Sequence, residues 1–237
     1  MKLAILQARM SSTRLPGKVL EPILGMPLIL RAIERISRAR ELDGIVLATS
    51  VDSSDDPLVD LAEKAGVTVR RGPLDDVLAR YIGVIAEFRP DTVVRLTGDN
   101  ALTDPDTIDL VVAEHVAHGA DYTSNTMLRT FPRGLDVEVA SAAVLCALHA
   151  TELSNEEREH VTMGIYRRPT EFRLHPVVQS PDRSDLRWTV DYPEDLAFAR
   201  DVYTDLYDRN PSFGQKEIIE LLARRPGLSR TESEVAH

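Results

Sequence analysis

Three cations lie in one short loop directly after the first apolar run of the chain. Arg9, Arg14 and Lys18 follow residues 3–6, Leu-Ala-Ile-Leu, and small hydroxyl residues lie among them. Guanidinium and ammonium groups donate charge-assisted hydrogen bonds to phosphate oxygens, and Gly17 lets backbone N–H groups approach such a ligand closely. In open α/β sheets ligands bind beyond the carboxyl ends of the strands, which is where this loop stands. The stretch predicts a polyphosphate-binding loop, and a solvated basic turn is the alternative.

Two aspartates, Asp99 and Asp191, each follow a predicted strand and could face the basic loop. Asp99 stands after Arg-Leu-Thr-Gly, and Asp191 stands after Trp-Thr-Val. Mg²⁺ prefers a few carboxylates together with phosphate oxygens and waters, so paired aspartates beside a polyphosphate would suit it. The alternatives are that Asp99 is a turn residue after a glycine and that Asp191 caps the helix opening at Pro193. For Asp191 alone the cap is the better interpretation; with the basic loop at the same sheet edge, the metal and structural interpretations are equally supported.

Other chemical patterns are absent or weak. The sequence has no Gly-x-x-x-x-Gly-Lys-Ser/Thr loop and no Gly-x-Gly-x-x-Gly after a strand, so it supports neither a Walker-type ATPase nor a Rossmann dehydrogenase. The single cysteine, Cys146, excludes a cysteine-rich zinc pattern and an internal disulfide, and favours a reducing compartment. His115 and His118 have ligand-capable spacing on one helix but no nearby third donor, so surface positions are expected. Residues 158–160, Arg-Glu-His, could act as a general acid and base or lie on an exposed helix face.

Length and charge limit the classes of protein. At 237 residues the chain suits one large or two small domains. Its formal net charge of -10, with cations interleaved among carboxylates, argues against a general nucleic-acid binder. The apolar run at the amino terminus has only a strand's length and is followed by charge, so we expect neither a signal peptide nor a membrane span. These features predict a cytoplasmic protein without nucleic-acid or membrane partners.

In the first half, short β-rich runs alternate with helix-period segments, which is the pattern of a parallel sheet covered on both faces. We predict strands at residues 3–6, 44–50, 67–70 and 91–97, and helices at 27–40, 58–65 and 74–88. The second half is less regular and reads as containing an insertion. There we predict helices at 105–118, 142–153, 193–208 and 214–222, a short helix capped by 154–157, and strands at 121–125, 135–140, 172–177 and 186–190. From Arg224 onward the chain is polar without a core-facing period, so a frayed tail is expected.

Five stretches taken together resemble the cytidylyltransferase family. They are residues 7–18, 95–99, 134–139, 158–161 and 187–195. The similarity is closest to the spore coat polysaccharide biosynthesis branch, with CMP-KDO synthetase and acylneuraminate cytidylyltransferase as relatives. It implies a glycosyltransferase-A-like three-layer α/β sandwich with a mostly parallel central sheet and a small dimerisation insertion. It also implies a homodimer, a nucleotidyltransferase domain over residues 1–209, and a C-terminal helix with a flexible tail over 210–237.

Carried over to this chain, the family pattern implies transfer of CMP from CTP to a sugar acid with release of pyrophosphate, for cell-surface polysaccharide or glycoconjugate biosynthesis. It makes Asp99 and Asp191 the ligands of Mg²⁺, and Arg14 and Lys18 catalytic groups that offset charge on the leaving pyrophosphate. The residues implied to bind the nucleotide are Ala8, Arg9, Ser12, Arg14, Lys18, Arg71, Asp76, Arg80, Thr97 and Asp99. Those implied to bind the small anionic acceptor are Asn100, Asp136, Glu138, Arg158 and His160.

One departure from the family pattern bears on the acceptor. Relatives usually have Gly-Asp-Cys-Pro-Leu or a similar turn, whereas Asn100 and Ala101 follow Asp99 here. The alternatives are therefore transfer to a phosphonate or a sugar phosphate, or a non-catalytic nucleotide-binding subunit. A glycosyltransferase is disfavoured, because such enzymes usually carry Asp-x-Asp after the fourth strand. A loop lysine is expected to have few packing neighbours, so replacing Lys18 is expected to weaken CTP binding more than folding.

Overall fold

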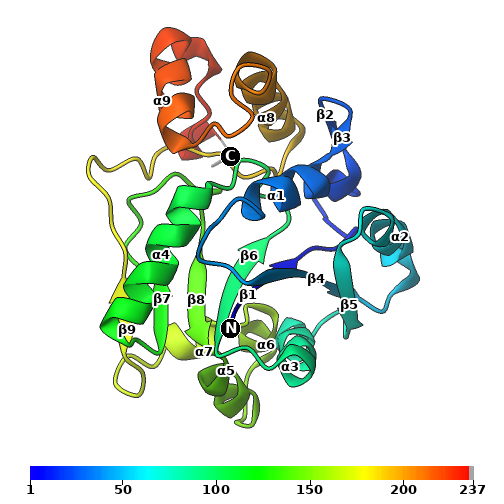
Figure 1. Ribbon diagram of the computed structural model, residues 1–237, viewed down its shortest axis with the longest axis vertical. Coiled ribbons are helices and arrows are strands. Elements are labelled where there is room, and N and C mark those ends of the chain that lie inside the picture. The colour runs from blue at the N-terminus through cyan, green and yellow to red at the C-terminus, as the bar shows by residue number, and fades with distance from the viewer. Residues whose placement is uncertain (235–237) are drawn as a thin grey trace.

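The computed structural model describes residues 1–234, and a seven-stranded sheet forms its centre (Figure 1). Its strands are β1 (Lys2–Gln7), β4 (Gly44–Ser50), β5 (Thr68–Gly72), β6 (Thr92–Thr97), β7 (Tyr122–Ser124), β8 (Glu138–Ser141) and β9 (Leu174–Pro176). They lie in the order β5-β4-β1-β6-β8-β7-β9. Strand β8 runs antiparallel to both of its neighbours, and the other neighbouring pairs are parallel. The α/β class with a mostly parallel central sheet is therefore confirmed.

Strand β1 is the central strand of the parallel half. Its side chains alternate between two cores, with Leu3 and Ile5 on one face and Ala4 and Leu6 on the other, and all four are buried. A strand that is apolar on both faces is typical of a parallel sheet that helices cover on both sides. The carboxyl ends of β1 and β6 consequently meet at one edge, because both strands run in the same direction.

Helices pack on both faces of the sheet and make three layers (Figure 1). The helices on one face are α1 (Leu28–Ile36), α2 (Asp56–Lys64) and α4 (Pro105–His118). Those on the other are α3 (Val77–Phe88), α5 (Ala142–His149) and α7 (Met163–Tyr166), with α6 (Asn155–Glu159) against α3. No helix within residues 1–234 has the length and apolarity that crossing a membrane requires.

A third core lies beyond the strand ends. Helices α8 (Pro193–Leu206) and α9 (Gln215–Arg224) pack there against each other and near the small hairpin of β2 (Pro22–Ile23) and β3 (Met26–Pro27). Figure 1 shows α8 and α9 stacked above one end of the sheet. Trp188 and Val190 are fully buried in this core. The segment that leads to Asp191 is therefore held by apolar packing.

The second half contains the main differences from the sequence-based expectation. Within the described part of the chain, residues 186–190, predicted as a strand, make the isolated bridges Arg133↔Arg187 and Leu186↔Thr231 and no regular pairing. The backbone groups of this segment bond to loops. Helix α1 ends at Ile36 and helix α5 at His149, earlier than predicted.

The predicted insertion does not stand apart from the sheet. Strands β7 and β8, which come from this region, extend the central sheet through the antiparallel pairing of β8 with β6. Its role in dimerisation stays a prediction, as does the domain boundary at residue 209. The segment expected to fray makes contacts up to Glu234: it includes the short helices η3 (Pro226–Leu228) and η4 (Glu232–Glu234), and Arg230 pairs with Asp195 at 2.9 Å.

Candidate active site

The basic loop leaves the end of β1 where β6 also ends. Gly98 joins the two strand ends, because its N–H donates to the carbonyl oxygen of Gln7 at 2.8 Å. A Cβ at this position would lie 2.7 Å from Cβ of Ala8 and 2.8 Å from Cδ1 of Ile29. A glycine is therefore required for this close approach, which brings the loop alongside the turn that carries Asp99.

A buried carboxylate holds the start of the loop. Asp55 accepts hydrogen bonds from the backbone N–H of Met10 at 2.7 Å and from Oγ1 of Thr49 at 2.8 Å. Burial by itself would raise the pKa of Asp55, but its hydrogen bonds outweigh this effect and lower the pKa. Asp52 caps the following turn by accepting from the N–H of Ser54. Asp55 therefore serves as an anchor for the basic loop.

Lys18 lies at the point where the predicted residues converge. Its Nζ donates to Oδ2 of Asp99 at 3.0 Å, to Oδ1 of Asp191 at 2.9 Å and to the carbonyl oxygen of Val190 at 2.6 Å. The basic loop and the two aspartates thus meet on one side of the sheet, as the sequence analysis proposed. The expectation that Lys18 has few neighbours is wrong, because the residue is only 7% exposed and holds three acceptors.

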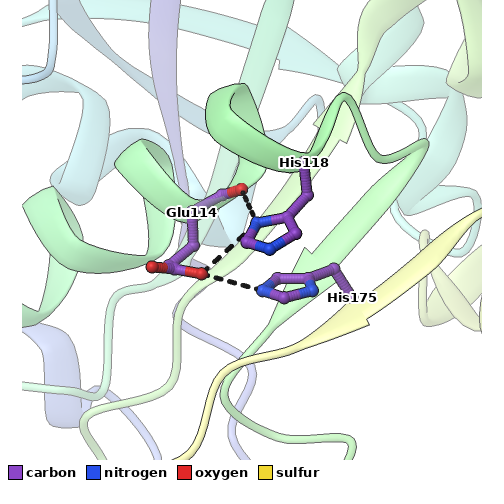
Figure 2. Close-up of side chains that lie close together, drawn as sticks. All are labelled: Glu114, His118 and His175. Carbon is purple, nitrogen blue, oxygen red and sulfur yellow. Dashed lines mark hydrogen bonds and ion pairs between the residues drawn. The ribbon is translucent and has the colours of Figure 1, made fainter.

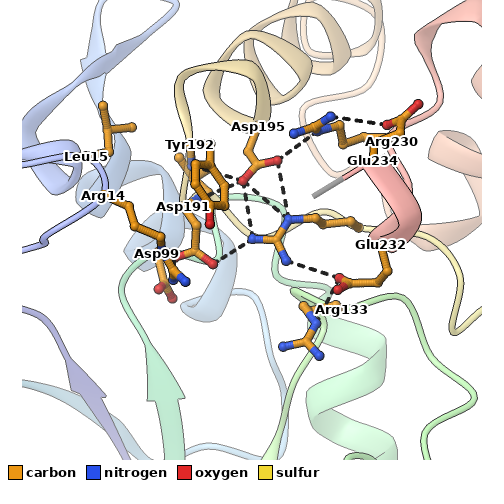
Figure 3. A network of polar contacts seen from close by, with 12 residues as sticks. Arg14, Leu15, Asp99, Arg133, Asp191, Tyr192, Asp195, Arg230, Glu232 and Glu234 are labelled. Carbon is orange, nitrogen blue, oxygen red and sulfur yellow. Dashed lines mark hydrogen bonds and ion pairs between the residues drawn. The ribbon is translucent and has the colours of Figure 1, made fainter. Parts of the chain in front are cut away.

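Asp191 is surrounded by positive charge (Figure 3). Its Oδ1 lies 2.7 Å from a terminal nitrogen of Arg14 and its Oδ2 accepts from Arg187 at 2.6 Å, in addition to the contact with Lys18. Burial alone would raise the pKa of the carboxyl group, but the hydrogen bonds and charges of Lys18, Arg187 and Arg14 lower it to about 2. Asp191 is therefore ionised at neutral pH.

The capping interpretation of Asp191 is wrong. The carboxylate of Asp195, one turn into α8, accepts hydrogen bonds from the backbone N–H groups of Asp191 and Tyr192, both at 3.0 Å. Asp195 thus satisfies the backbone at the start of the helix. The side chain of Asp191 is left to face Lys18 and Arg14. A backbone bond from the N–H of Val190 to the carbonyl oxygen of Asp99, 3.0 Å long, holds the two aspartate segments side by side.

Sequence reasoning missed a second set of charged residues behind Asp191 (Figure 3). Arg187, which is 4% exposed, contacts Asp191, Asp195 and Glu232, and Glu232 also pairs with Arg133 at 2.8 Å. Arg187 belongs to the stretch 187–195, which also contains Asp191, and this closeness in sequence was the available signal. The partners from the C-terminal segment gave no signal, because that segment has no apolar period.

A cavity of about 260 Å³ lies beside these residues, and we call it the strand-end cavity. Most of the predicted nucleotide and metal residues line it, together with one predicted acceptor residue: Ala8, Arg9, Ser12, Arg14, Lys18, Arg80, Thr97, Asp99, Asp191 and His160. Arg80 is 5% exposed and its Nε has no hydrogen-bond partner. A buried guanidinium nitrogen without a partner beside a cavity favours an anionic ligand there.

A second cavity of about 640 Å³, the β8 cavity, is lined by residues of β8 and its neighbours. Two predicted acceptor residues, Asp136 and Glu138, line it, and His160 lines both cavities. Arg129 pairs with Asp136 through two contacts of 2.6 and 3.1 Å, and Arg95 pairs with Glu138. The shared histidine places the two cavities next to each other. Sequence reasoning missed Arg129 and Arg95, since no pattern marked them.

Four predicted residues line neither cavity. Arg71 donates to the carbonyl oxygens of Ser50 and Asp52 at 2.7 and 2.8 Å. Asp76 caps α3 by accepting from the N–H of Ala79 at 2.8 Å, and it pairs with Arg158 at 2.9 Å. The fourth, Asn100, is buried and donates to Oγ1 of Thr97 at 2.9 Å. These contacts give each residue a structural role, and a contact with a ligand stays a prediction.

The chemistry at Lys18 suits a divalent cation. Two carboxylates, whose side chains are 27% and 13% exposed, converge on one ammonium group at the wall of the strand-end cavity. In the folded chain the positive charge of Lys18 lies between the negative charges of Asp99 and Asp191 and partly compensates them. Carboxylate oxygens at the edge of a phosphate-sized cavity are the donors that Mg²⁺ takes.

Comparison with known proteins gives matches over most of the chain. The family model described as cytidylyltransferase matches residues 3–219. The spore coat polysaccharide biosynthesis protein SpsF of Bacillus subtilis is 35% identical over 98% of both chains. A 3-deoxy-manno-octulosonate cytidylyltransferase of Anaeromyxobacter dehalogenans is 38% identical over 46% of this chain and 44% of that protein. The solved structure of a cytidylyltransferase from Leptospira borgpetersenii superposes with a TM-score of 0.91 at 29% identity, covering 96% of this chain and 95% of that one.

Proposed function

Because the chain belongs to the cytidylyltransferase family, and is thus a nucleotidyltransferase, we propose that it couples CTP to a sugar acid to give a CMP-sugar and pyrophosphate. The convergence of Lys18, Asp99 and Asp191 at the wall of the strand-end cavity carries this proposal. The product would serve polysaccharide biosynthesis, in line with the name of the Bacillus subtilis relative. A homodimer and a cytoplasmic location stay predictions.

The strand-end cavity would bind the triphosphate of CTP. Arg9, Arg14, Lys18 and Arg80 line it and offer guanidinium and ammonium donors to phosphate oxygens. Arg14 also stacks over the ring of Tyr192, with its central carbon 5.2 Å from the ring centroid, which restricts the conformations of its side chain. A cation held in place before the reaction needs little reorganisation when negative charge grows on the leaving pyrophosphate.

Asp99 and Asp191 would hold Mg²⁺. When bound, the metal would supply positive charge against the phosphate oxygens and lower the pKa of a coordinated hydroxyl. The protein's own contribution is to keep the two carboxylates adjacent through the Val190–Asp99 backbone bond, and to hold Asp191 in place through its contact with Arg187. Lys18 would then turn from the carboxylates toward the phosphates, since Mg²⁺ would compensate the negative charge of the two carboxylates.

The acceptor would occupy the β8 cavity. A sugar acid carries a carboxylate. Arg129 and Arg133 line this cavity, and their planar guanidinium groups can each bind one carboxylate through two parallel hydrogen bonds. The name of the Anaeromyxobacter dehalogenans relative refers to an acceptor of this class, 3-deoxy-manno-octulosonate. The acceptor hydroxyl would attack the α-phosphorus in line as the bond to the pyrophosphate oxygen breaks, and the hydroxyl proton would be released. His160 lines both cavities, so it would lie between CTP and the acceptor.

A pyrophosphate-release screen tests this function. It crosses the four ribonucleoside triphosphates with a panel of sugar acids, sugar phosphates and phosphonates, each with and without Mg²⁺. Release with CTP and a sugar acid that requires Mg²⁺ would support the proposal. Release only with a phosphonate or a sugar phosphate would replace the acceptor, and binding of CTP without turnover for any acceptor would favour a non-catalytic nucleotide-binding subunit.

A further inference from the structure

Three potential metal ligands meet at the edge of the sheet, outside both cavities (Figure 2). Glu114 and His118 lie one turn apart on α4, and His175 is the middle residue of the edge strand β9. One donor atom from each lies within 4.8 Å of the others. We call these three residues the edge cluster. The surface position predicted for His115 is wrong, because His115 is buried and bonds to Thr123. The expectation that His118 has no further donors nearby is also wrong, because Glu114 and His175 lie beside it.

Contacts within the edge cluster hold its three side chains together. Nε2 of His175 lies 2.9 Å from Oε2 of Glu114, and Nδ1 of His118 lies 3.4 Å from the same oxygen. The two imidazole rings are stacked, with centroids 3.7 Å apart and an interplanar angle of 16°. The stack therefore keeps the two rings side by side next to the carboxylate of Glu114.

The backbone fixes the tautomer of His118. Its Nδ1 lies 3.0 Å from the carbonyl oxygen of Glu114, and a carbonyl oxygen only accepts, so Nδ1 carries the hydrogen. In the neutral ring Nε2 then keeps its lone pair. Metal-binding histidines commonly have this arrangement, in which one ring nitrogen donates to a carbonyl and the other coordinates the ion.

We propose that the edge cluster binds a Zn²⁺ ion. Two imidazoles and one carboxylate are a donor set that Zn²⁺ accepts, and solvent can supply the fourth position because the side chains of His118 and Glu114 are 51% and 36% exposed. Neighbouring ligands of a tetrahedral zinc lie roughly 3.3 Å apart. The donor atoms of the edge cluster lie within 4.8 Å of one another, so the widest separation would need to close by about 1.5 Å at most. Partly exposed side chains can do this by rotation.

The ion would tie an edge strand to a helix. His175 belongs to β9, a three-residue strand that pairs only with β7 within the described residues, while the other two ligands belong to the last turns of α4. Bound Zn²⁺ would thus stabilise the folded form by linking these two elements. Mg²⁺ prefers oxygen donors, so the edge cluster would discriminate against the metal proposed for the strand-end cavity.

Zinc titration of the full-length protein tests this site. Wild type, His118→Ala, His175→Ala and the control His149→Ala are titrated with Zn²⁺ by isothermal calorimetry, each also in an Asp99→Asn background that weakens zinc binding at the aspartates. We expect one zinc site that survives Asp99→Asn and His149→Ala, and at least a roughly tenfold loss of affinity in His118→Ala and His175→Ala.

Thermal unfolding supplies a second measurement. In the Asp99→Asn background, Zn²⁺ should raise the Tm of the protein with an intact edge cluster and of His149→Ala, and should leave the Tm of His118→Ala and His175→Ala unchanged, while Mg²⁺ should not reproduce the effect. Unfolding without metal shows whether each variant is folded, and the milder His118→Gln replaces any variant that is not. Equal zinc affinity in wild type and both edge variants, or zinc binding that disappears with Asp99→Asn alone, would overturn the proposal.

Discussion

The strand-end cavity and the β8 cavity use charge in opposite ways. At the strand-end cavity several cations share one carboxylate: Lys18 and Arg14, which line the cavity, and Arg187 behind it all contact Asp191. In the β8 cavity Arg95 pairs with Glu138 and Arg129 pairs with Asp136, while Arg133 shares Glu232 with Arg187. The first cavity therefore has positive charge available for a ligand, although the chain as a whole has a net charge of -10.

This difference explains how adjacent cavities can select different anions. A polyphosphate entering the strand-end cavity meets cations whose charge is not fully compensated, so attraction extends into solution. A carboxylate entering the β8 cavity has to compete with Asp136 for Arg129, and only a ligand that reproduces the geometry of that pair gains from the exchange. The strand-end cavity would therefore contribute affinity, and the β8 cavity would contribute selectivity.

The most severe test of the comparison is Asp191→Asn, which removes the shared carboxylate while keeping its size. We expect turnover to fall by roughly a hundredfold or more, because a charged metal ligand is lost from the reacting centre. Steady-state pyrophosphate release at several Mg²⁺ concentrations measures this. Asp201→Asn, on the exposed side of α8, is the control. An unchanged rate with an unchanged metal requirement would show that Asp191 is not a ligand.

Lys18→Met removes the cation that joins the two aspartates. We expect CTP binding to weaken at least tenfold, and the free energy of unfolding to fall by about 2 kcal/mol, because two partly buried carboxylates lose a partner. Calorimetric CTP titration and urea unfolding measure the two effects. Lys64→Met, at the exposed end of α2, is the control. An unchanged free energy of unfolding together with weak CTP binding would mean that Arg14 and Arg187 compensate the charge of Asp191 without Lys18.

The pH dependence of stability tests the charge surplus around Asp191. Burial opposes ionisation of Asp191, but Lys18, Arg187 and Arg14 lower its pKa to about 2, against about 3.9 in an unfolded chain. Because the folded-state pKa is the lower one, the ionised carboxylate stabilises the fold above about pH 4, and this contribution disappears as the pH falls toward 2. We expect Asp191→Asn to be less stable than wild type by about 2 kcal/mol at pH 7 and by less at pH 3. Urea unfolding across this range measures it, and a constant difference would contradict the assignment.

Arg129→Met sharpens the comparison from the side of the β8 cavity. We expect the KM for the acceptor to rise about tenfold while the KM for CTP stays unchanged, since one bidentate donor is lost. Initial rates with either substrate varied separate the two constants. Arg173→Met is the matched control, because Arg173 makes a similar two-contact pair with Asp121 but lines neither cavity. A rise in the KM for CTP instead would assign Arg129 to the nucleotide.

The sequence predicted the strand-end region well because its signals are local. The strand at residues 44–50 appears as β4 with the predicted bounds, and the basic loop and Asp99 follow strands whose apolar pattern is strong. Parallel strands place their ends at one edge, so their relative position followed from general rules. The role of Asp55 was missed, since no sequence pattern distinguishes an acid exposed in a turn from one that is buried and accepts from the N–H of Met10.

The β8 region was harder because its contacts are distant along the chain. Residues 186–190 have the composition of a strand, yet their backbone bonds go to Arg133, Asp99 and Arg230 in separate loops. Arg129 is marked by no pattern, and only its pairing with Asp136 reveals a place in a cavity. The edge cluster depends in the same way on His175, which lies far along the chain from α4.

The bond between Lys18 and Asp191 joins residues that are 173 positions apart. During synthesis, β1, the basic loop and Asp99 leave the ribosome long before Asp191 does, and folding can start with the earlier elements. Until the segment before α8 has emerged, Asp99 is the one carboxylate of this pair that Lys18 can contact. Truncation anywhere upstream of residue 191 therefore yields a fragment in which this three-residue assembly cannot exist.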